Sequence, residues 1–279
     1  MSTLAAGTWN VLNGGGARLP AIVDHLRTLK LDVLCIQEAK GWDKDDFRIM
    51  REEVAEPLGM EAHLAASNSH GCHLVTLFGP RLKLETDGWT PDIVLGRFHH
   101  TASRARLTLD GDDGRPVQLT VINTHLAPFS PATRAIEAGW LTEYADPDSP
   151  TLILGDLNEP CPQDREPDWD QEMPRHLWSR HRRREGGQYT DAGRDAIGAL
   201  LDAGFRHTAA QLGQTPQPTV GHWTPTEPWE HVSDYILTSP GLDNVLQLDH
   251  CTVPRPPDDL RLSDHDPVVA QYTVLDSAA

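Results

Sequence analysis

Six groups of polar residues lie where apolar stretches of the chain begin or end, and they contain the Asn, Asp, Glu and His side chains that bind cations and move protons. The groups are Trp9-Asn10, Gln37-Glu38, Asn123-Thr124-His125, Gly155-Asp156-Leu157-Asn158, Asp234-Tyr235 and Ser263-Asp264-His265-Asp266. One such group alone is more typical of a turn, because Asn and Asp favour turns. The whole set predicts a common site if these strand ends share one edge of a sandwich.

Two of the groups are stronger evidence for a functional site than the others. In Asp156-Leu157-Asn158, alternation along an extended segment puts both polar side chains on the same side. In Asp264-His265-Asp266, two acids flank a histidine directly before an apolar strand, where an unpartnered charge is costly. Both groups are therefore leading candidates for a functional site.

The residue types indicate a definite chemistry. Carboxylates and Asn carbonyls without a Cys cluster are hard oxygen ligands, which favour Mg²⁺ or Mn²⁺ over Zn²⁺. Histidine adds general acid–base capacity near neutral pH. A hard cation, carboxylates and histidine together suit attack of activated water on a phosphate ester.

Short apolar runs bounded by turn signals predict the strands that would position these groups. Beside the segment that ends at Asn10, the predicted strands are Leu31–Ile36, His73–Phe78, Ala105–Leu109, Val117–Asn123, Thr151–Leu154, Asp234–Leu237 and Val268–Val274. Amphipathic stretches predict helices over Arg18–Lys30, Asp45–Leu58, Pro131–Tyr144 and Asp191–Ala203. The run Asp110–Gly114 predicts a hairpin turn.

These elements predict an α+β fold, because strands follow one another through both helices and hairpin-like turns. We expect a four-layered α/β sandwich, in which two mixed β-sheets pack face to face and helices cover the outer faces. No interdomain linker is visible, so residues 1–279 are expected to form one domain.

One segment breaks this pattern. Residues 159–190 are polar, contain proline and lack clean periodicity, which predicts an irregular insertion. The segment begins acidic and then turns basic, with an Arg- and His-rich stretch at 175–184. It is either a solvated insertion with internal charge pairing or a loop whose Arg/His cluster faces an anionic substrate.

Composition and charge exclude several classes of protein. The 279 residues carry a net charge of −17 at pH 7, which gives no general attraction to a nucleic-acid backbone, although a local basic patch could still act. No stretch of about 18 apolar residues exists that could span a membrane. The N-terminus lacks the basic region of a signal peptide, and the four cysteines are far apart, so a cytoplasmic protein with reduced thiols is expected.

Taken in their order along the chain, the six polar groups resemble the motifs of the endonuclease/exonuclease/phosphatase superfamily, the DNase I-like metal-dependent phosphoesterases. The match runs from residue 8 to about residue 270 and comprises W-N, Q-E, N-T-H-L, G-D-L-N, S-D-Y-I-L and S-D-H-D-P. The ordered set is highly specific for the superfamily and poorly specific for a substrate.

The resemblance implies a role for each matched residue. Glu38 corresponds to the principal metal carboxylate, with Asn10 and Asp264 beside it, for Mg²⁺ or Mn²⁺. The number of metal ions stays open.

The remaining matched residues correspond to catalytic groups. Asp156 corresponds to the residue that orients or deprotonates the attacking water, and Asn158 to one that holds the phosphate. His265 corresponds to a histidine that contacts the scissile phosphate or acts in acid–base catalysis, oriented by Asp234. His125 stands where DNase-like branches have histidine and the abasic-site branch has tyrosine. The resemblance leaves open whether His265 or Asp156 is the base.

A further set of residues is predicted to touch the substrate. Arg104 and Arg106 flank a strand near His125, and His222 precedes the Asp234 strand. Arg182 and Arg183 belong to the Arg/His-rich stretch. Each of the five is alternatively an exposed residue without such a role.

The function that these residues predict is metal-dependent hydrolysis of a phosphodiester, in a nucleic acid, a nucleotide or another small ester. The alternatives are a phosphomonoesterase acting on a small phosphorylated metabolite or lipid headgroup, and an inactive binding module of the same fold. The matched positions show no lost ligand, which argues against the inactive module. The oligomeric state is not predicted.

Overall fold

The computed structural model describes residues 2–110, 116–225, 228–257 and 260–275, and all statements below refer to these ranges. Within them, the strands form two six-stranded sheets and one separate hairpin. The first sheet has the order β13 (Leu246–Thr252), β14 (Val268–Val274), β1 (Thr3–Asn10), β2 (Val33–Gln37), β4 (Leu74–Phe78) and β3 (Glu61–Ala65). The second has the order β11 (Arg206–His207), β12 (Asp234–Thr238), β8 (Thr151–Asp156), β7 (Pro116–His125), β6 (Thr101–Asp110) and β5 (Leu82–Thr90).

Both sheets are mixed. In the described chain, β1 runs parallel to β2 and β7 runs parallel to β8, whereas the other neighbouring strands of the sheets are antiparallel. The strands β2, β4, β8 and β12 are buried along their whole length, as expected for strands covered on both faces, which read as continuous apolar runs.

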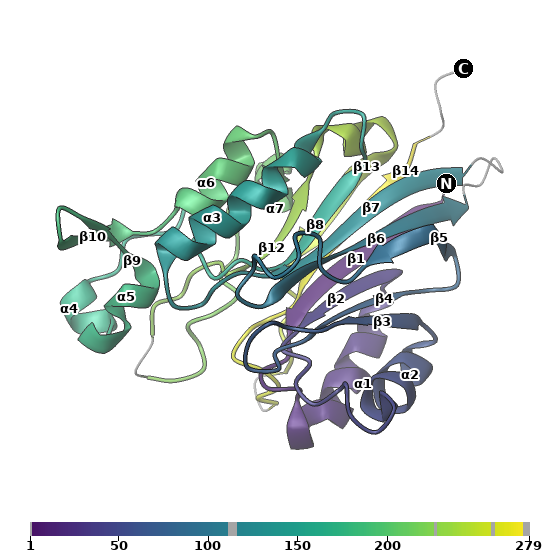
Figure 1. Ribbon diagram of the computed structural model, residues 1–279, viewed down its shortest axis with the longest axis horizontal. Coiled ribbons are helices and arrows are strands. Elements are labelled where there is room, and N and C mark those ends of the chain that lie inside the picture. The colour runs from purple at the N-terminus through teal and green to yellow at the C-terminus, as the bar shows by residue number, and fades with distance from the viewer. Residues whose placement is uncertain (1, 111–115, 226–227, 258–259, 276–279) are drawn as a thin grey trace.

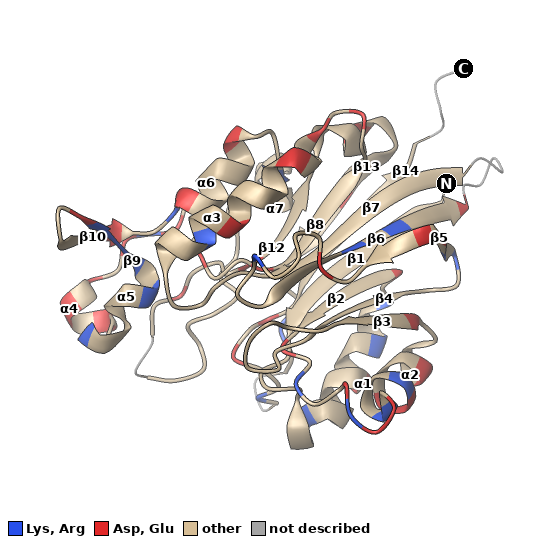
Figure 2. Ribbon diagram, in the orientation of Figure 1, with Lys and Arg blue, Asp and Glu red and all other residues tan. Residues whose placement is uncertain are grey.

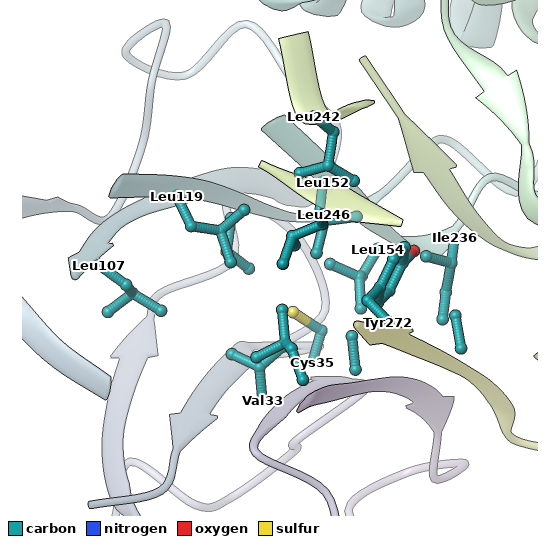
Figure 3. Packing of buried hydrophobic residues seen from close by; sticks show 14 of the residues in the cluster. Val33, Cys35, Leu107, Leu119, Leu152, Leu154, Ile236, Leu242, Leu246 and Tyr272 are labelled. Atoms are coloured by element: carbon teal, nitrogen blue, oxygen red, sulfur yellow. The ribbon is translucent and has the colours of Figure 1, made fainter. Parts of the chain in front are cut away.

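The two sheets pack face to face. Val33 and Cys35 of the first sheet lie in one buried cluster with Leu107, Leu119 and Leu154 of the second (Figure 3). Burial of apolar surface at about 25 cal/mol per Å² makes this interface a main source of stability.

Helices cover both outer faces (Figure 1). On the first sheet lie α1 (Leu19–Leu29) and a π-helical turn, Ile49–Ala55, that continues into α2 (Glu56–Leu58). On the second lie α3 (Pro131–Leu141) and α6 (Asp195–Asp202). Short helical segments complete the described structure: α7 (Thr208–Gln211) and 3₁₀ turns at Gly16–Arg18, Thr142–Ala145 and Pro240–Asn244. The predicted four-layered α/β sandwich is confirmed.

Local sequence explains where the helices begin. Ser130 caps α3, because its Oγ accepts a hydrogen bond from the backbone N–H of Thr133 at 3.3 Å, and Pro131 occupies the first turn. The helix predicted over Asp45–Leu58 begins only at Ile49, since Asp45, Asp46 and Phe47 have positive φ. The helix predicted from Asp191 begins at Asp195, because residues 191 and 192 belong to a strand.

The strands β3, β5 and β13 were not predicted. Their exposed and half-exposed positions give them few of the apolar runs on which the prediction relied. The predicted hairpin turn at 110–114 lies largely outside the described residues, although β6 and β7 pair antiparallel up to Asp110 and Pro116.

The 159–190 segment contains more regular structure than the sequence indicates. It includes α4 (Trp169–Glu172), a 3₁₀ turn at Arg175–Leu177, α5 (Trp178–His181) and the hairpin of β9 (Arg182–Glu185) and β10 (Gln188–Ala192). These elements project from the sandwich beyond α3 (Figure 1). A separate apolar cluster holds them together, formed by Met173, Leu177, Trp178, Ala192 and Trp229.

None of the helices in the described ranges combines the length and the apolar character needed to cross a bilayer. The four cysteines are free and buried.

Candidate active site

The six sequence groups meet at one edge of the sandwich. Asn10 pairs with Gln37 at the ends of β1 and β2. Asp156, at the end of β8, pairs with His125 of β7 on one side and with Asp234 of β12 on the other. The remaining group, 263–266, leads into β14, whose first residue pairs with β1. Strand pairing therefore brings together residues that are far apart in the sequence.

Three residues form a buried chain of polar contacts at the centre of this edge. Nδ1 of His265 lies 2.8 Å from Oδ2 of Asp234, and its Nε2 lies 3.7 Å from Oδ2 of Asp156. Asp234 is fixed by Thr219, whose Oγ1 donates to the same Oδ2 at 2.7 Å. The hydroxyl of Ser233 donates to Oδ1 of Asp156 at 2.8 Å. The imidazole thus lies between two carboxylates that are themselves held in place.

This arrangement sets the charge states. Burial disfavours a charged His265, but the carboxylates of Asp234 and Asp156 outweigh burial and raise its pKa well above 6.5. Burial likewise opposes ionisation of Asp156, yet His265 and His125 lower its pKa overall. Burial raises the pKa of Asp234 to about 6. At neutral pH the centre therefore holds a cationic His265 beside an ionised Asp156.

Glu38 is held by the turn that follows β1. Its Oε2 accepts a hydrogen bond from the backbone N–H of Asn13 at 2.7 Å, and its carbonyl accepts from Gly14 at 2.7 Å. Glu38 itself has φ 57°, a conformation that is uncommon outside glycine and often found at functional sites. Gly14 is required here, because a Cβ at this position would lie 2.2 Å from the carbonyl oxygen of Lys40.

Asn10 and Asp264 flank Glu38. Nδ2 of Asn10 lies 3.4 Å from Oε1 of Glu38 and 3.1 Å from Oδ2 of Asp156. The guanidinium of Arg18 is close enough to both Asp264 and Glu38 for each to favour its charged form. Ser263 ties this group to β1 by donating from Oγ to the carbonyl of Asn10 at 2.7 Å.

Asn158 and His125 lie on the other side of Asp156. The backbone N–H of Asn158 donates to Oδ1 of Asp156 at 2.9 Å, and its Nδ2 donates to the carbonyl of Leu126 at 3.0 Å. Nε2 of His125 lies 3.3 Å from Oδ2 of Asp156. The ring of His125 stacks on His100, with the ring centres 4.3 Å apart.

These residues line a cleft of about 540 Å³, within the size range of small-molecule sites. Of the predicted site residues, Glu38, His125, Asp156, Asn158, Asp264 and His265 line it. Much of the remaining lining comes from the 159–190 segment and from the loop before β12, through Met173, Arg180, His181, Val220, Gly221, Trp223, Thr224, Trp229 and His231. Asn10 and Asp234 are each 1% exposed and are not among the residues that line the cleft in the described chain.

The five residues predicted to touch the substrate lie elsewhere. Arg104 and Arg106 are three and five residues along β6 from Thr101, the partner of His125, or roughly 10 Å and more from the cleft end of the strand. Arg104 donates to Oγ1 of Thr90, and Arg106 donates to the carbonyl of Asp87. Both arginines therefore belong to the outer surface of the second sheet.

The other three residues are likewise absent from the cleft lining in the described chain, and their side chains contact other groups. Arg182 lies 4.4 Å over the ring of Trp178 and donates to the carbonyl of Thr190, and Arg183 pairs with Asp195 at 3.0 Å. His222 turns toward Asp266, with Nδ1 3.7 Å from Oδ2, while its neighbours Gly221 and Trp223 line the cleft.

Several residues of the site lie outside the matched motifs. His100 lines the cleft but stands outside every motif, and burial lowers its pKa to about 2, so that it is neutral. Thr219 and Arg180 come from the long segments before β12. Thr219 is placed by its bonds to Asp234 and Ser233, and Arg180 by the bond from Arg134 to its carbonyl.

The donor set of the cleft floor fits a hard divalent cation. Glu38, Asp156 and Asp264 bring three carboxylates to one cleft, lined in the described chain by a single Lys or Arg side chain, Arg180. A second group, Asp156, Asp234 and His265, has its potential ligand atoms within 4.8 Å of one another. However, Asp234 is buried behind His265 and bonded to it, which is the geometry of an oriented histidine rather than of an open cation site.

A four-layered sandwich with carboxylates, asparagine and an oriented histidine in a cleft at its strand ends defines a hydrolase-like class of active site. The chain belongs to the Endonuclease/Exonuclease/phosphatase family, whose model matches residues 7–265. Members of this family hydrolyse phosphate esters, generally with a divalent cation. No curated protein matches the whole sequence significantly.

Solved structures share the fold at low sequence identity. An endonuclease/exonuclease/phosphatase from Bacteroides vulgatus is 13% identical, with a TM-score of 0.69, 99% of this chain and 100% of that chain being covered. TDP2 from D. rerio, in complex with a single-strand DNA product, is 15% identical, with a TM-score of 0.64 and coverage of 98% and 100%. The mannosyl-6-phosphatase of Bacteroides thetaiotaomicron is 14% identical, with a TM-score of 0.63 and the same coverage.

Proposed function

We propose that this protein is a divalent-cation-dependent phosphoesterase that hydrolyses phosphodiesters by attack of activated water. The observation that carries the proposal is the placement of His265 between Asp234 and Asp156, in the cleft that Glu38, Asn158 and Asp264 also line. An acid–base pair and a hard-cation floor in one cleft support this chemistry.

The residues divide the work as follows. Asp156, ionised and fixed by Ser233, accepts a hydrogen bond from the attacking water and orients it. The protonated His265 donates a hydrogen bond to a phosphate oxygen as charge develops there, and Asp234 keeps its ring in place. Asn158 uses one amide hydrogen for the carbonyl of Leu126 and keeps the other for the phosphate. His125 steadies Asp156 from the opposite side.

Glu38, Asn10 and Asp264 would hold the cation, Mg²⁺ or Mn²⁺. When bound, the cation supplies Lewis-acid stabilisation of the charge on the phosphoryl group. Asn10 also links this group to Asp156, since its Nδ2 lies near both carboxylates.

The charge of the cleft favours a diester over a monoester. A monoester brings about two negative charges at neutral pH, whereas a diester brings one. Arg180 is the one guanidinium that lines the described part of the cleft, whereas three carboxylates line it. A phosphomonoesterase remains the second candidate, because the cation and His265 could together neutralise a dianion.

Release of p-nitrophenol from its phosphate bis-ester and mono-ester tests the proposal. The reactions would run with Mn²⁺ or Mg²⁺ and then with EDTA, and Asp156→Ala would serve as the contamination control. We expect cation-dependent turnover that the variant loses, faster on the bis-ester. Turnover that persists in Asp156→Ala or in EDTA would contradict the proposal. Faster hydrolysis of the mono-ester than of the bis-ester would favour the second candidate, a phosphomonoesterase.

A further inference from the structure

The 159–190 segment brings one free cation to the cleft. Arg180 lines the cleft from α5, apart from the strand ends that carry the catalytic residues, and within the described chain its guanidinium has no hydrogen-bond or ion-pair partner. Every other Lys or Arg side chain of the described part is outside the cleft lining. Arg180 therefore differs from the rest of the molecule's positive charge, which is dispersed among acidic residues (Figure 2).

The other arginines of the segment are occupied. Arg165 forms a bidentate pair with Glu172, with both distances 2.6 Å. Arg175 lies over the ring of Trp178, and Arg184 donates to the carbonyl of Gly187. Arg182 and Arg183 are engaged as described above. The other arginines of the segment thus have partners within the protein, and Arg180 is left to bind a ligand.

The backbone of Arg180 is fixed to the catalytic edge. Its carbonyl accepts a hydrogen bond from Nη2 of Arg134 at 2.9 Å, and Arg134 pairs through Nε with Glu159 at 3.0 Å. Both side chains of that pair are fully buried, and Glu159 directly follows Asn158. Nη1 of Arg134 also donates to the carbonyl of Ala127 at 3.2 Å. One buried guanidinium therefore connects Arg180 to the loops that follow β7 and β8.

The neighbouring residue is held as well. The ring of His181 packs edge-on against Trp229 and His231, with ring centres 5.7 and 5.8 Å apart. Its backbone carbonyl accepts from Gly193 at 2.7 Å. Because its backbone is fixed, Arg180 loses only side-chain freedom when it binds a ligand, which lowers the entropic cost of recognition.

We propose that Arg180 binds a second phosphate group of the substrate, remote from the phosphate that is cleaved. The substrate class is then a small phosphodiester that carries a further phosphate. This inference rests on the proposed function for the identity of the cleaved group, but the pairing of Arg180 with a second phosphate can be measured without turnover. A guanidinium matches phosphate geometry with two parallel hydrogen bonds, which gives selectivity as well as attraction.

Calorimetric binding of two ligands on one scaffold tests the proposal: thymidine 3′,5′-bisphosphate and thymidine 5′-monophosphate. Ca²⁺ would replace Mg²⁺ to slow any cleavage. We expect the wild type to bind the bisphosphate at least ~10-fold more tightly, as one charge-assisted bidentate contact provides. Arg180→Gln should lose this preference while binding the monophosphate as the wild type does, and Arg180→Lys should keep part of it.

Arg184→Gln is the matched control, because it removes the same charge from the same segment on the hairpin side. It should retain the wild-type preference, which separates a specific contact from a general change in net charge. The proposal would be overturned if the wild type and Arg180→Gln preferred the bisphosphate equally. It would also be overturned if the wild type showed no preference for the bisphosphate over the monophosphate. Unchanged thermal unfolding of Arg180→Gln would show that the segment keeps its fold.

A turnover measurement separates this proposal from the proposed function. The 5′-p-nitrophenyl ester of thymidine 5′-phosphate, with and without a 3′-phosphate, releases the same coloured product. We expect the 3′-phosphate to lower KM in the wild type and not in Arg180→Gln, with similar kcat. Absence of turnover of both esters beside an Arg180-dependent binding preference would contradict the proposed hydrolysis and leave the phosphate subsite standing.

Discussion

Asp234 acts on the cleft only through His265. Its Oδ2 lies 2.8 Å from Nδ1 of His265, and Thr219 holds the same oxygen at 2.7 Å from the other side. Asp234 is 1% exposed and lies behind the ring, so that a ligand in the cleft meets His265 and not Asp234. Asp234 is therefore a positioning residue, and its removal should affect the chemical step more than binding.

Asp234→Asn should lower kcat by ~10²–10⁴-fold and leave KM nearly unchanged, because an amide cannot stabilise the protonated ring or keep its orientation. Steady-state release of p-nitrophenol from the bis-ester measures both constants. Asp249→Asn is a matched control, since Asp249 is an exposed carboxylate whose side chain accepts a hydrogen bond from Thr273, away from the cleft lining in the described chain. A variant with wild-type kcat would show that His265 needs no oriented partner.

Glu38→Gln should weaken Mn²⁺ binding and activity together, because it removes a negative charge from the cation floor while preserving the size of the side chain. Titration calorimetry with Mn²⁺ measures the affinity, and Glu53→Gln, which alters an exposed ion pair with Arg48, is the control. If Asp234→Asn reduced the Mn²⁺ affinity and Glu38→Gln did not, the cation would belong to the group of Asp156, Asp234 and His265.

Glu159→Gln should destabilise the folded chain by about 3–5 kcal/mol, because it leaves the buried charge of Arg134 without its partner. Both side chains are completely buried, so water cannot compensate. Urea unfolding followed by circular dichroism gives the free energy of unfolding. The double variant Arg134→Met/Glu159→Met should recover part of the loss, and equal destabilisation in single and double variants would exclude an unpaired charge as its cause.

His207→Asn should make stability less sensitive to acid. Burial lowers the pKa of His207 from 6.5 to about 4 in the folded chain. As the pH falls below 6.5 the unfolded chain binds a proton first, so stability is lost until the pH reaches about 4, by up to ~1.4 kcal/mol per pH unit. Asn keeps the helix cap, since its Oδ1 can accept the bond from Ala209 that Nδ1 of His207 accepts at 3.1 Å.

Urea unfolding of both proteins at several pH values between about 7 and 4 measures the difference. The two stability curves should diverge as the pH falls, the wild type losing more. Parallel curves would mean that His207 is not held neutral in the folded state.

Sequence reasoning was strongest for residues at strand ends. Glu38 and Asp156 follow fully buried strands, and a strand buried on both faces leaves a readable apolar run with a definite end. Within each sheet, parallel pairing places Gln37 beside Asn10 and Asp156 beside His125, and the packing of the two sheets brings these pairs together. The same reasoning yields the sandwich, because the long amphipathic helices α1 and α3 show clear apolar faces.

The residues that the 159–190 segment brings to the cleft could not be predicted in this way. Arg180 and Arg182 are two positions apart in a run of basic residues, yet one lines the cleft and the other is enclosed by Trp169, Trp178 and Tyr189. Their difference arises from aromatic packing and from a bond to the distant Arg134. No local pattern encodes such contacts.

The buried pair of Arg134 and Glu159 has a consequence for how specificity can change. Arg134 holds α5 through the backbone carbonyl of Arg180, an atom that every amino acid supplies, whereas its side-chain partner is Glu159, the first residue of the segment. The side chains that line the cleft can therefore change while the backbone of the segment stays attached to the catalytic edge. Exchange of residues 160–190 for a sequence of similar length, with Glu159 retained, offers a route to new ester preferences that leaves the hydrolytic residues untouched.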